Sequence, residues 1–85
     1  MNLDRKTVVV DGIPISLTRT EFDLLSLLLM HRGTVLSRQQ LMDDVWTGVI
    51  VTERTINVHI TRLRKKLGPY ASNITSRQGF GYVFE

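Results

Sequence analysis

Length, composition and charge restrict this chain to one small domain. It has 85 residues, of which 42% are hydrophobic and 22% are charged, with a formal net charge of +3 and no cysteine. A chain of this size removes roughly 60% of its unfolded surface from water, so a large catalytic cleft is not expected. Disulfides are excluded, and the histidines and carboxylates show no metal-ligand spacing. We therefore expect no metal, no cofactor and no enzymatic activity.

The N-terminal residues and the longest apolar run bear on location. Residues 24–30 form an apolar stretch, interrupted by Ser26, that is far shorter than the roughly 20 residues needed to span a bilayer. Residues 1–6, MNLDRK, are too polar to open a secretory signal. We interpret them as a linker or a truncated first strand before a domain of residues 7–85. We expect the protein to be cytoplasmic, without a membrane partner.

Residues 7–17, TVVVDGIPISL, predict an N-terminal antiparallel β-hairpin. Two β-rich runs flank Asp11 and Gly12, a dipeptide that tolerates the positive φ of a tight turn. Pro14 lacks an N–H donor and therefore suits an edge strand.

Three helix starts follow, because a similar capping pattern occurs three times. Thr18 precedes Glu21 by three residues, which is the spacing of a capping box. Ser37 and Gln40 repeat this spacing, and Thr52 supplies a third N-cap. These signals predict helices that begin at about residues 19, 38 and 53.

Glycine and proline mark the helix ends. Gly33 follows the first helix, and the second helix is short, ending near Val45 or Trp46. Gly68 and Pro69 follow the third helix, supplying a residue that can turn left-handed and one that cannot continue a helix. The remaining residues contain two short β-like runs bent around 78–81. The order of hairpin, three helices and hairpin predicts an α+β fold.

The third helix, residues 53–67, has two distinct faces. At about 100° per residue, four apolar side chains lie within a narrow arc that is typical of a buried face. They are Ile56, Ile60, Leu63 and Leu67. The opposite surface carries Arg54, Val58, Thr61, Arg62 and Lys65, with Thr55 and Asn57 at its margins. Residues 53–67 have a net charge of +4, which leaves −1 for the other 70 residues.

The polar surface of this helix has the properties of a DNA recognition helix. Arg62, Lys65 and Lys66 have no acidic partner at i,i+4 spacing, unlike the cations of an ordinary solvated helix. Val58 can meet a thymine methyl group, and the fork of Arg62 suits guanine. A helix about 10–12 Å wide fits a major groove about 12 Å wide. Residues 38–46 would support it in a helix-turn-helix, although the connection TGVIVT is longer than the usual turn.

A protein interaction module is the alternative function. In that case the basic helix docks an acidic partner instead of DNA. Phosphate neutralisation by several cations predicts an affinity for duplex DNA that falls steeply with salt. A salt titration on duplex DNA therefore distinguishes the two functions.

Three segments occur in an order and at a spacing that point to a known family. They are LTRTEFDLLSLLLMHRGTVLSRQQLMDDVW (17–46), ERTINVHITRLRKKLG (53–68) and GFGYVF (79–84). Together they resemble the DNA-binding effector domain of OmpR/PhoB-type response regulators, a winged helix-turn-helix. The resemblance covers nearly the whole chain.

The resemblance implies a fold and a set of partners. The fold is an N-terminal antiparallel sheet, three helices and a C-terminal hairpin wing. The third helix enters the major groove, and the wing, at about residues 74–84, lies on the DNA backbone or in the minor groove. A homodimer is expected to bind double-stranded DNA head to tail on direct repeats. A receiver domain, phosphorylated by a sensor kinase, is implied as well but is missing from this chain, as in an excised fragment.

The resemblance assigns roles to side chains of the third helix. Val58, Thr61 and Arg62 match positions that approach bases, although many relatives carry a longer or basic side chain in place of Thr61. The matches to phosphate-contacting positions are Arg54, Asn57, His59, Arg64 and Lys65.

The resemblance also assigns wing contacts to Arg77, Gln78 and Tyr82. The family commonly reads Thr-Val-Arg-Gly before the final Gly-Tyr, whereas residues 76–79 read SRQG, with the arginine one position early. Successive strand residues point to opposite faces. Either Arg77 faces away from DNA and Gln78 takes its place, or a bulge restores its direction.

The connection between the second and third helices corresponds to a loop that contacts RNA polymerase in several relatives. The candidate contact residues are Thr47, Gly48, Val49 and Ile50. This loop is unusually apolar. Either Val49 and Ile50 are exposed partner contacts, or they pack against Trp46 and the core.

Overall fold

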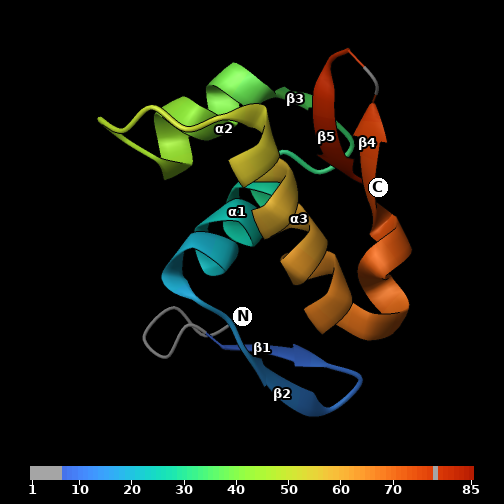
Figure 1. Cartoon of the computed structure of the whole chain (residues 1–85). Helices are drawn as coiled ribbons and strands as arrows, with labels where there is room; N and C mark the ends of the chain where they lie inside the picture. The colour runs from blue at the N-terminus through green and yellow to red at the C-terminus, as the bar shows by residue number, and fades with distance from the viewer. Residues whose placement is uncertain (1–6, 78) are drawn as a thin grey trace.

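The structure, a computed structural model, describes residues 7–77 and 79–85. The expected linker or first strand, residues 1–6, and the predicted wing contact Gln78 lie outside the described residues. Figure 1 shows the N-terminal hairpin at one end, the helices in the middle and a second hairpin beside them. The described part of the chain has the predicted α+β fold.

The structure contains the N-terminal β-hairpin that the sequence predicted. Strand β1 (Thr7–Val10) pairs antiparallel with β2 (Ile13–Ser16). Asp11 and Gly12, which lie between the two strands, have φ angles of 50° and 81°, as a two-residue type I′ turn requires. Among the described residues this sheet has two strands, so Pro14 lies on an edge. Alternate residues of β1 join the core, which places one face of the hairpin against the helices.

Three helices begin where the capping patterns predicted. They are α1 (Arg19–Met30), α2 (Arg38–Val45) and α3 (Glu53–Leu67). Complete capping boxes start α1 and α2, and at α3 the Thr52 hydroxyl accepts the Thr55 N–H at 3.2 Å. No helix in the described part of the chain is long and apolar enough to cross a membrane.

The core forms where α1, α3 and the second hairpin meet. The four apolar residues predicted to form the inner face of α3 are at most 3% exposed. They pack in one cluster with residues that include Phe22, Leu24, Leu25, Leu28 and Phe84. Burying one such side chain contributes roughly 1.5–3 kcal/mol, so the cluster decides which side of α3 faces inward.

The second hairpin is the predicted wing, and it belongs to a three-stranded sheet. Strand β4 (Ile74–Arg77) pairs antiparallel with β5 (Gly81–Phe84). A third strand, β3 (Leu36–Ser37), pairs with the other edge of β5 and was not predicted. Two residues directly before a helix carry no β pattern of their own, so only the contact with β5 makes them a strand.

A second unpredicted element lies between α3 and the wing. Helix α3 ends at Leu67, and Gly68, whose φ is 58°, follows it as expected. In place of extended chain, Gly68–Asn73 forms a 3-10 helix, η1, with Pro69 in its first turn. Proline suits that position, because the first N–H groups of a helix have no acceptor within it. The Tyr70 hydroxyl donates to the Asp11 carboxylate at 2.9 Å, which ties η1 to the N-terminal turn and raises the pKa of Tyr70.

Glycine at position 81 allows β3 to approach β5 closely. Gly81 has a φ of 153°, and a Cβ there would lie 1.9 Å from the carbonyl oxygen of Leu36. Gly79 also has a positive φ, of 82°, but a Cβ there would meet open space. Substitution of each glycine by alanine therefore distinguishes two costs. Gly79 tests the positive φ alone, whereas Gly81 tests the positive φ together with the close approach of β3.

A buried carboxylate joins α1 to α3. The Glu21 side chain is 3% exposed, and its Oε1 accepts from Lys66 Nζ at 2.6 Å and from the Thr18 N–H at 2.9 Å. Burial raises the pKa of Glu21, but hydrogen bonds from Lys66 and Thr18 outweigh burial and hold this pKa below its ordinary value. The sequence shows no acidic partner for Lys66 within α3. The structure gives it one on α1, Glu21.

Substitution of Glu21 by Gln is expected to lower the free energy of unfolding by roughly 1–3 kcal/mol at pH 7, because Lys66 loses its charged partner. The folded-state pKa of Glu21 lies below the unfolded value. Its contribution is therefore present above the unfolded pKa and is lost as pH falls through the folded pKa. Urea unfolding at several pH values should show wild type and E21Q converging on acidification.

The control for E21Q is Asp23→Asn on the same helix. Asp23 pairs with Arg19 at 3.9 Å on the surface, so its loss should change stability little. A gap between wild type and E21Q that stays constant down to low pH would contradict the role given to the Glu21 charge.

Gly81→Ala is expected to destabilise the domain more than Gly79→Ala. Each replacement places alanine at a positive φ, which costs roughly 1–3 kcal/mol. Only the alanine at 81 also collides with the Leu36 carbonyl and forces β3 away from β5. Thermal unfolding of the two variants checks this; equal losses would mean that backbone conformation alone accounts for the effect.

Candidate nucleic-acid interface

The outward side of α3 carries side chains that the described fold does not use. We call Arg54, Val58, Thr61, Arg62 and Lys65 the outer face of α3; all five are exposed. Within the described residues, its three cations form no hydrogen bond or ion pair. Val58, at its centre, is 36% exposed. Unpaired cations on one rigid surface create a positive potential that attracts a polyanion.

One margin of the outer face is fixed by contact with the end of α2. The Nδ1 atom of His59 lies 2.8 Å from the Thr55 carbonyl oxygen, and its ring packs edge to face on Trp46 with centroids 5.4 Å apart. His59, a predicted phosphate contact, is therefore half-buried at the margin, with Nε2 as the nitrogen outside this hydrogen bond. The described residues contain no group of three or more histidine and carboxylate side chains that could hold a metal ion.

The other margin of the outer face turns toward the wing and η1. The Tyr82 hydroxyl donates to Asn57 Oδ1 at 3.5 Å, the upper limit of a hydrogen bond. Arg64 Nε donates to the Ala71 carbonyl at 3.2 Å, while the Arg64 side chain stays exposed. Asn57 and Arg64, both predicted phosphate contacts, thus flank the outer face and do not lie at its centre.

A polar hollow of about 380 Å³ separates the start of α3 from the wing. Its lining consists of Arg38, Glu53, Arg54, Asn57, Ser76 and Tyr82. Arg38 Nε pairs with Glu53 at 3.1 Å, and its guanidinium lies 5.8 Å from the centre of the Tyr82 ring. No sequence pattern singled out Arg38. The one feature of the sequence that could have identified it is its position in the first turn of α2, where the helix dipole disfavours a positive charge.

The wing turns Arg77 away from this hollow. Ser76 lines the hollow, and the next residue of an extended strand points to the opposite face. The register between Ile74 and Arg77 is regular and contains no bulge. Arg77 forms an ion pair with Glu85, whose carboxylate also accepts from the Thr75 hydroxyl at 3.2 Å. Within Ile74–Arg77 no bulge turns Arg77 toward the hollow; its alternative partner, Gln78, lies outside the described residues.

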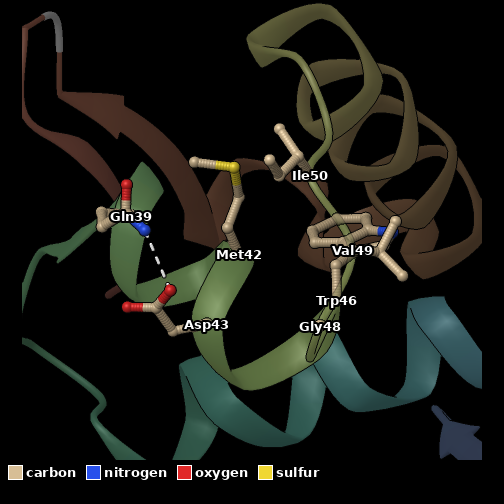
Figure 2. A pocket seen from close by; sticks show the side chains of 7 residues that line it. All are labelled: Gln39, Met42, Asp43, Trp46, Gly48, Val49 and Ile50. Atoms are coloured by element: carbon tan, nitrogen blue, oxygen red, sulfur yellow. Dashed lines mark hydrogen bonds between the residues drawn. The ribbon is translucent and has the colours of Figure 1, made fainter.

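The connection between α2 and α3 borders an apolar hollow of about 550 Å³, shown in Figure 2. Its lining residues are Gln39, Met42, Asp43, Trp46, Gly48, Val49 and Ile50. Thr47 donates to the Asp43 carbonyl at 3.3 Å, and Gly48 turns the chain with a φ of 75°. Val49 is 58% and Ile50 97% exposed. Ile50 is therefore an exposed side chain and is not packed on the core.

Comparison with known proteins identifies relatives along most of the chain. A family model described as "Transcriptional regulatory protein, C terminal" matches residues 12–84. The phosphate regulon transcriptional regulatory protein PhoB of Pseudomonas aeruginosa is 44% identical over 79 residues, which cover 91% of this chain and 34% of that protein. The chain spans well under half of the length of the curated relatives that it matches.

Two solved DNA-binding domains have the same fold. The Klebsiella pneumoniae RstA domain, in complex with the RstA box, is 31% identical with a TM-score of 0.84, covering 98% of this chain and 86% of that one. The domain of response regulator AdeR, in complex with an intercistronic region, is 28% identical with a TM-score of 0.88, covering 100% and 90%. The described fold is thus a winged helix. The chain belongs to the family of C-terminal domains of transcriptional regulatory proteins, the effector domains of OmpR/PhoB-type response regulators.

Proposed function

We propose that this domain binds double-stranded DNA sequence-specifically, with α3 in the major groove. The observation that carries the proposal is the outer face of α3, whose three cations and two short side chains are exposed and without described partners. A helix about 10–12 Å wide matches a groove about 12 Å wide. The DNA complexes of the related RstA and AdeR domains support the same class of partner.

The position of each side chain on the outer face suggests its role. Val58, Thr61 and Arg62 are proposed to meet base edges. Val58 offers methyl groups to thymine, and Arg62 offers two donors to guanine O6 and N7. Thr61 is short, so it leaves room for these neighbours to reach the bases. Arg54 and Lys65, at the two ends of the face, are proposed to contact phosphates and fix the register.

The margins of α3 and the wing complete the contact with the DNA backbone. Asn57, His59 and Arg64 are proposed phosphate contacts on either side of the outer face. A sugar–phosphate strand would occupy the polar hollow, whose lining includes Tyr82 of β5 and Arg54 of α3. The carboxylate of Glu53 would repel a phosphate in the hollow, but the ion pair with Arg38 neutralises its charge. Arg77 and Gln78 remain predicted wing contacts.

We also propose an assembly and a control mechanism, both supported by family membership. Two copies bind head to tail on direct repeats. In the whole protein, a receiver domain phosphorylated by a sensor kinase controls this pairing. The segment matched here is 34% of the length of PhoB, which leaves room for such a domain in a protein of that size.

Arg62→Ala and Lys65→Ala should weaken DNA binding in different ways. Arg62→Ala is expected to relax base preference and to cost roughly 1–3 kcal/mol on a cognate duplex. Lys65→Ala should weaken all sequences about equally and reduce the slope of log affinity against log salt by about 1. Fluorescence anisotropy on a duplex chosen by random-oligonucleotide selection, and on a random duplex, over a salt series measures both effects.

Arg19→Ala is the matched control, because Arg19 lies on α1 with a side chain 85% exposed. It removes the same charge but should leave specific binding and the salt slope unchanged. Equal losses from Arg62→Ala and Lys65→Ala on specific and random DNA would contradict the division of roles. Absence of salt-sensitive binding to any duplex would contradict the proposed function itself.

We further propose that residues 47–50 contact RNA polymerase. Ile50 and Val49 are exposed beside Met42 and Trp46, as Figure 2 shows. A contiguous exposed apolar surface of this kind is typical of a protein contact. This surface is formed by the end of α2 and the segment between α2 and α3, and it contains no residue of the outer face of α3.

Ile50→Ser is expected to leave DNA affinity and stability unchanged but to reduce binding of RNA polymerase to promoter DNA that the protein already occupies. The reason is the loss of an exposed apolar contact. Gel retardation of the ternary complex measures this effect. Ile13→Ser, at an isoleucine of β2 that is 65% exposed, is the control; an equal effect of both variants, or no effect of Ile50→Ser, would rule out the contact.

A further inference from the structure

The fold decides which ring nitrogen of His59 carries a proton. The Nδ1 atom lies 2.8 Å from the carbonyl oxygen of Thr55, one turn earlier on α3. A carbonyl oxygen can only accept a hydrogen bond, so Nδ1 must carry the proton of this bond. In a neutral imidazole the other nitrogen is then unprotonated. Neutral His59 therefore presents a bare lone pair at Nε2.

The other neutral tautomer of His59 does not suit this position. It would bring an unprotonated Nδ1 within 2.8 Å of the Thr55 carbonyl oxygen, and two acceptors at that distance repel one another. The ring is also held by Trp46 at the end of α2, on which it packs edge to face with centroids 5.4 Å apart. The hydrogen bond selects the tautomer, and the aromatic contact keeps the ring in place.

The Nε2 atom of His59 is open to a partner from outside the domain. Within the described residues it forms no hydrogen bond, and Ser26 Oγ is the one buried side-chain nitrogen or oxygen there without a partner. Nε2 is therefore unpaired and not buried. The proposed function places a DNA phosphate at this margin of the outer face. A phosphodiester oxygen has no proton to donate, so it can bond to Nε2 only if Nε2 carries a proton.

The charged groups on the elements around His59 do not supply it with an anion. On α3, Arg62 lies one turn further along and disfavours a second positive charge in the free protein. On α2, Asp43 accepts a side-chain amide hydrogen bond within its own helix at 2.9 Å. Glu21 of α1 is paired with a lysine, and residues 47–52 contain no ionisable side chain. No described carboxylate forms an ion pair with His59.

We propose that His59 contacts a DNA phosphate only as the imidazolium, so that each copy takes up one proton from the solvent when it binds the duplex. This inference rests on the proposed function. The protonated ring donates from Nδ1 to the Thr55 carbonyl and from Nε2 to the phosphate, so both N–H groups have acceptors. Histidine is the side chain that ordinarily changes charge between pH 5 and 8. DNA binding by this domain therefore strengthens as the pH falls through that range.

Proton uptake affects both the pH dependence and the salt dependence of binding. Where uptake is complete, linkage raises the affinity by up to about tenfold for each unit that the pH falls. The imidazolium also neutralises one more phosphate. The slope of log affinity against log salt is therefore steeper by about 1 at pH 6 than at pH 8.

The experiment measures the affinity of the domain for a selected duplex between pH 6 and pH 8 at fixed salt. His59→Gln stays neutral, so its affinity should not follow pH; it should match wild type at pH 8 and be roughly tenfold weaker at pH 6. His59→Lys supplies a permanent cation and should bind tightly at both pH values. Calorimetry in buffers that differ in ionisation enthalpy counts the protons taken up by wild type and by His59→Gln.

Nitrogen-15 NMR of the imidazole rings follows the same proton in the unaltered protein. In the free domain at pH 8, the His59 shifts should be those of a neutral ring protonated at Nδ1. In the complex at pH 6, they should be those of an imidazolium. A ring that stays neutral in this complex overturns the inference, whatever the variants do.

His31→Gln is the matched control, because His31 is the other histidine of the chain and lies exposed at the end of α1. This variant should keep the pH dependence of wild type. Equal pH dependence in wild type and His59→Gln, with Arg62→Ala still weakened, overturns the inference and leaves the proposed function standing. If wild type shows no salt-sensitive binding to any duplex at either pH, the proposed function itself fails.

Discussion

Burial of the apolar side of α3 is the constraint on which the rest of the structure depends. Ile56, Ile60 and Leu63 are at most 2% exposed, and they pack in one cluster with side chains of α1 and β5. A shift of the helix by one residue turns its faces by about 100° and would replace buried hydrocarbon with charged side chains. The outer face is therefore held in one orientation by a close-packed interior, and its side chains present a fixed pattern to a ligand.

The cations of α3 fall into two groups: some form hydrogen bonds or ion pairs within the domain, and others have no described partner. Lys66 is paired with a buried carboxylate, and Arg64 donates to the Ala71 carbonyl of η1. Arg54, Arg62 and Lys65 have no such partners among the described residues. The charge count of the segment thus overstates the unpaired surface. Position on the helix, relative to α1 on one side and η1 on the other, decides which cations a polyanion can meet.

The wing is anchored at its base and exposed at its tip. Strand β3 pairs with β5 at Leu36 and Ser37, so the start of α2 and the wing are fixed to one another. Asn73 and Glu85 hold the other end of the hairpin. Phe80, beyond these contacts, is 73% exposed. The arrangement places the hairpin beside the start of α3, with a polar hollow between them.

The sequence by itself determined the helix starts, the N-terminal turn, the two faces of α3 and the existence of the wing. Each depends on residues within a few positions of one another, as in the capping box of Thr18 or the turn at Gly12, so local chemistry suffices. Only the tertiary structure decided the strand character of residues 36–37, the partner of Lys66 and the direction of Arg77. These depend on groups distant in the chain or on register, and the contact that selects them exists only after the core has formed.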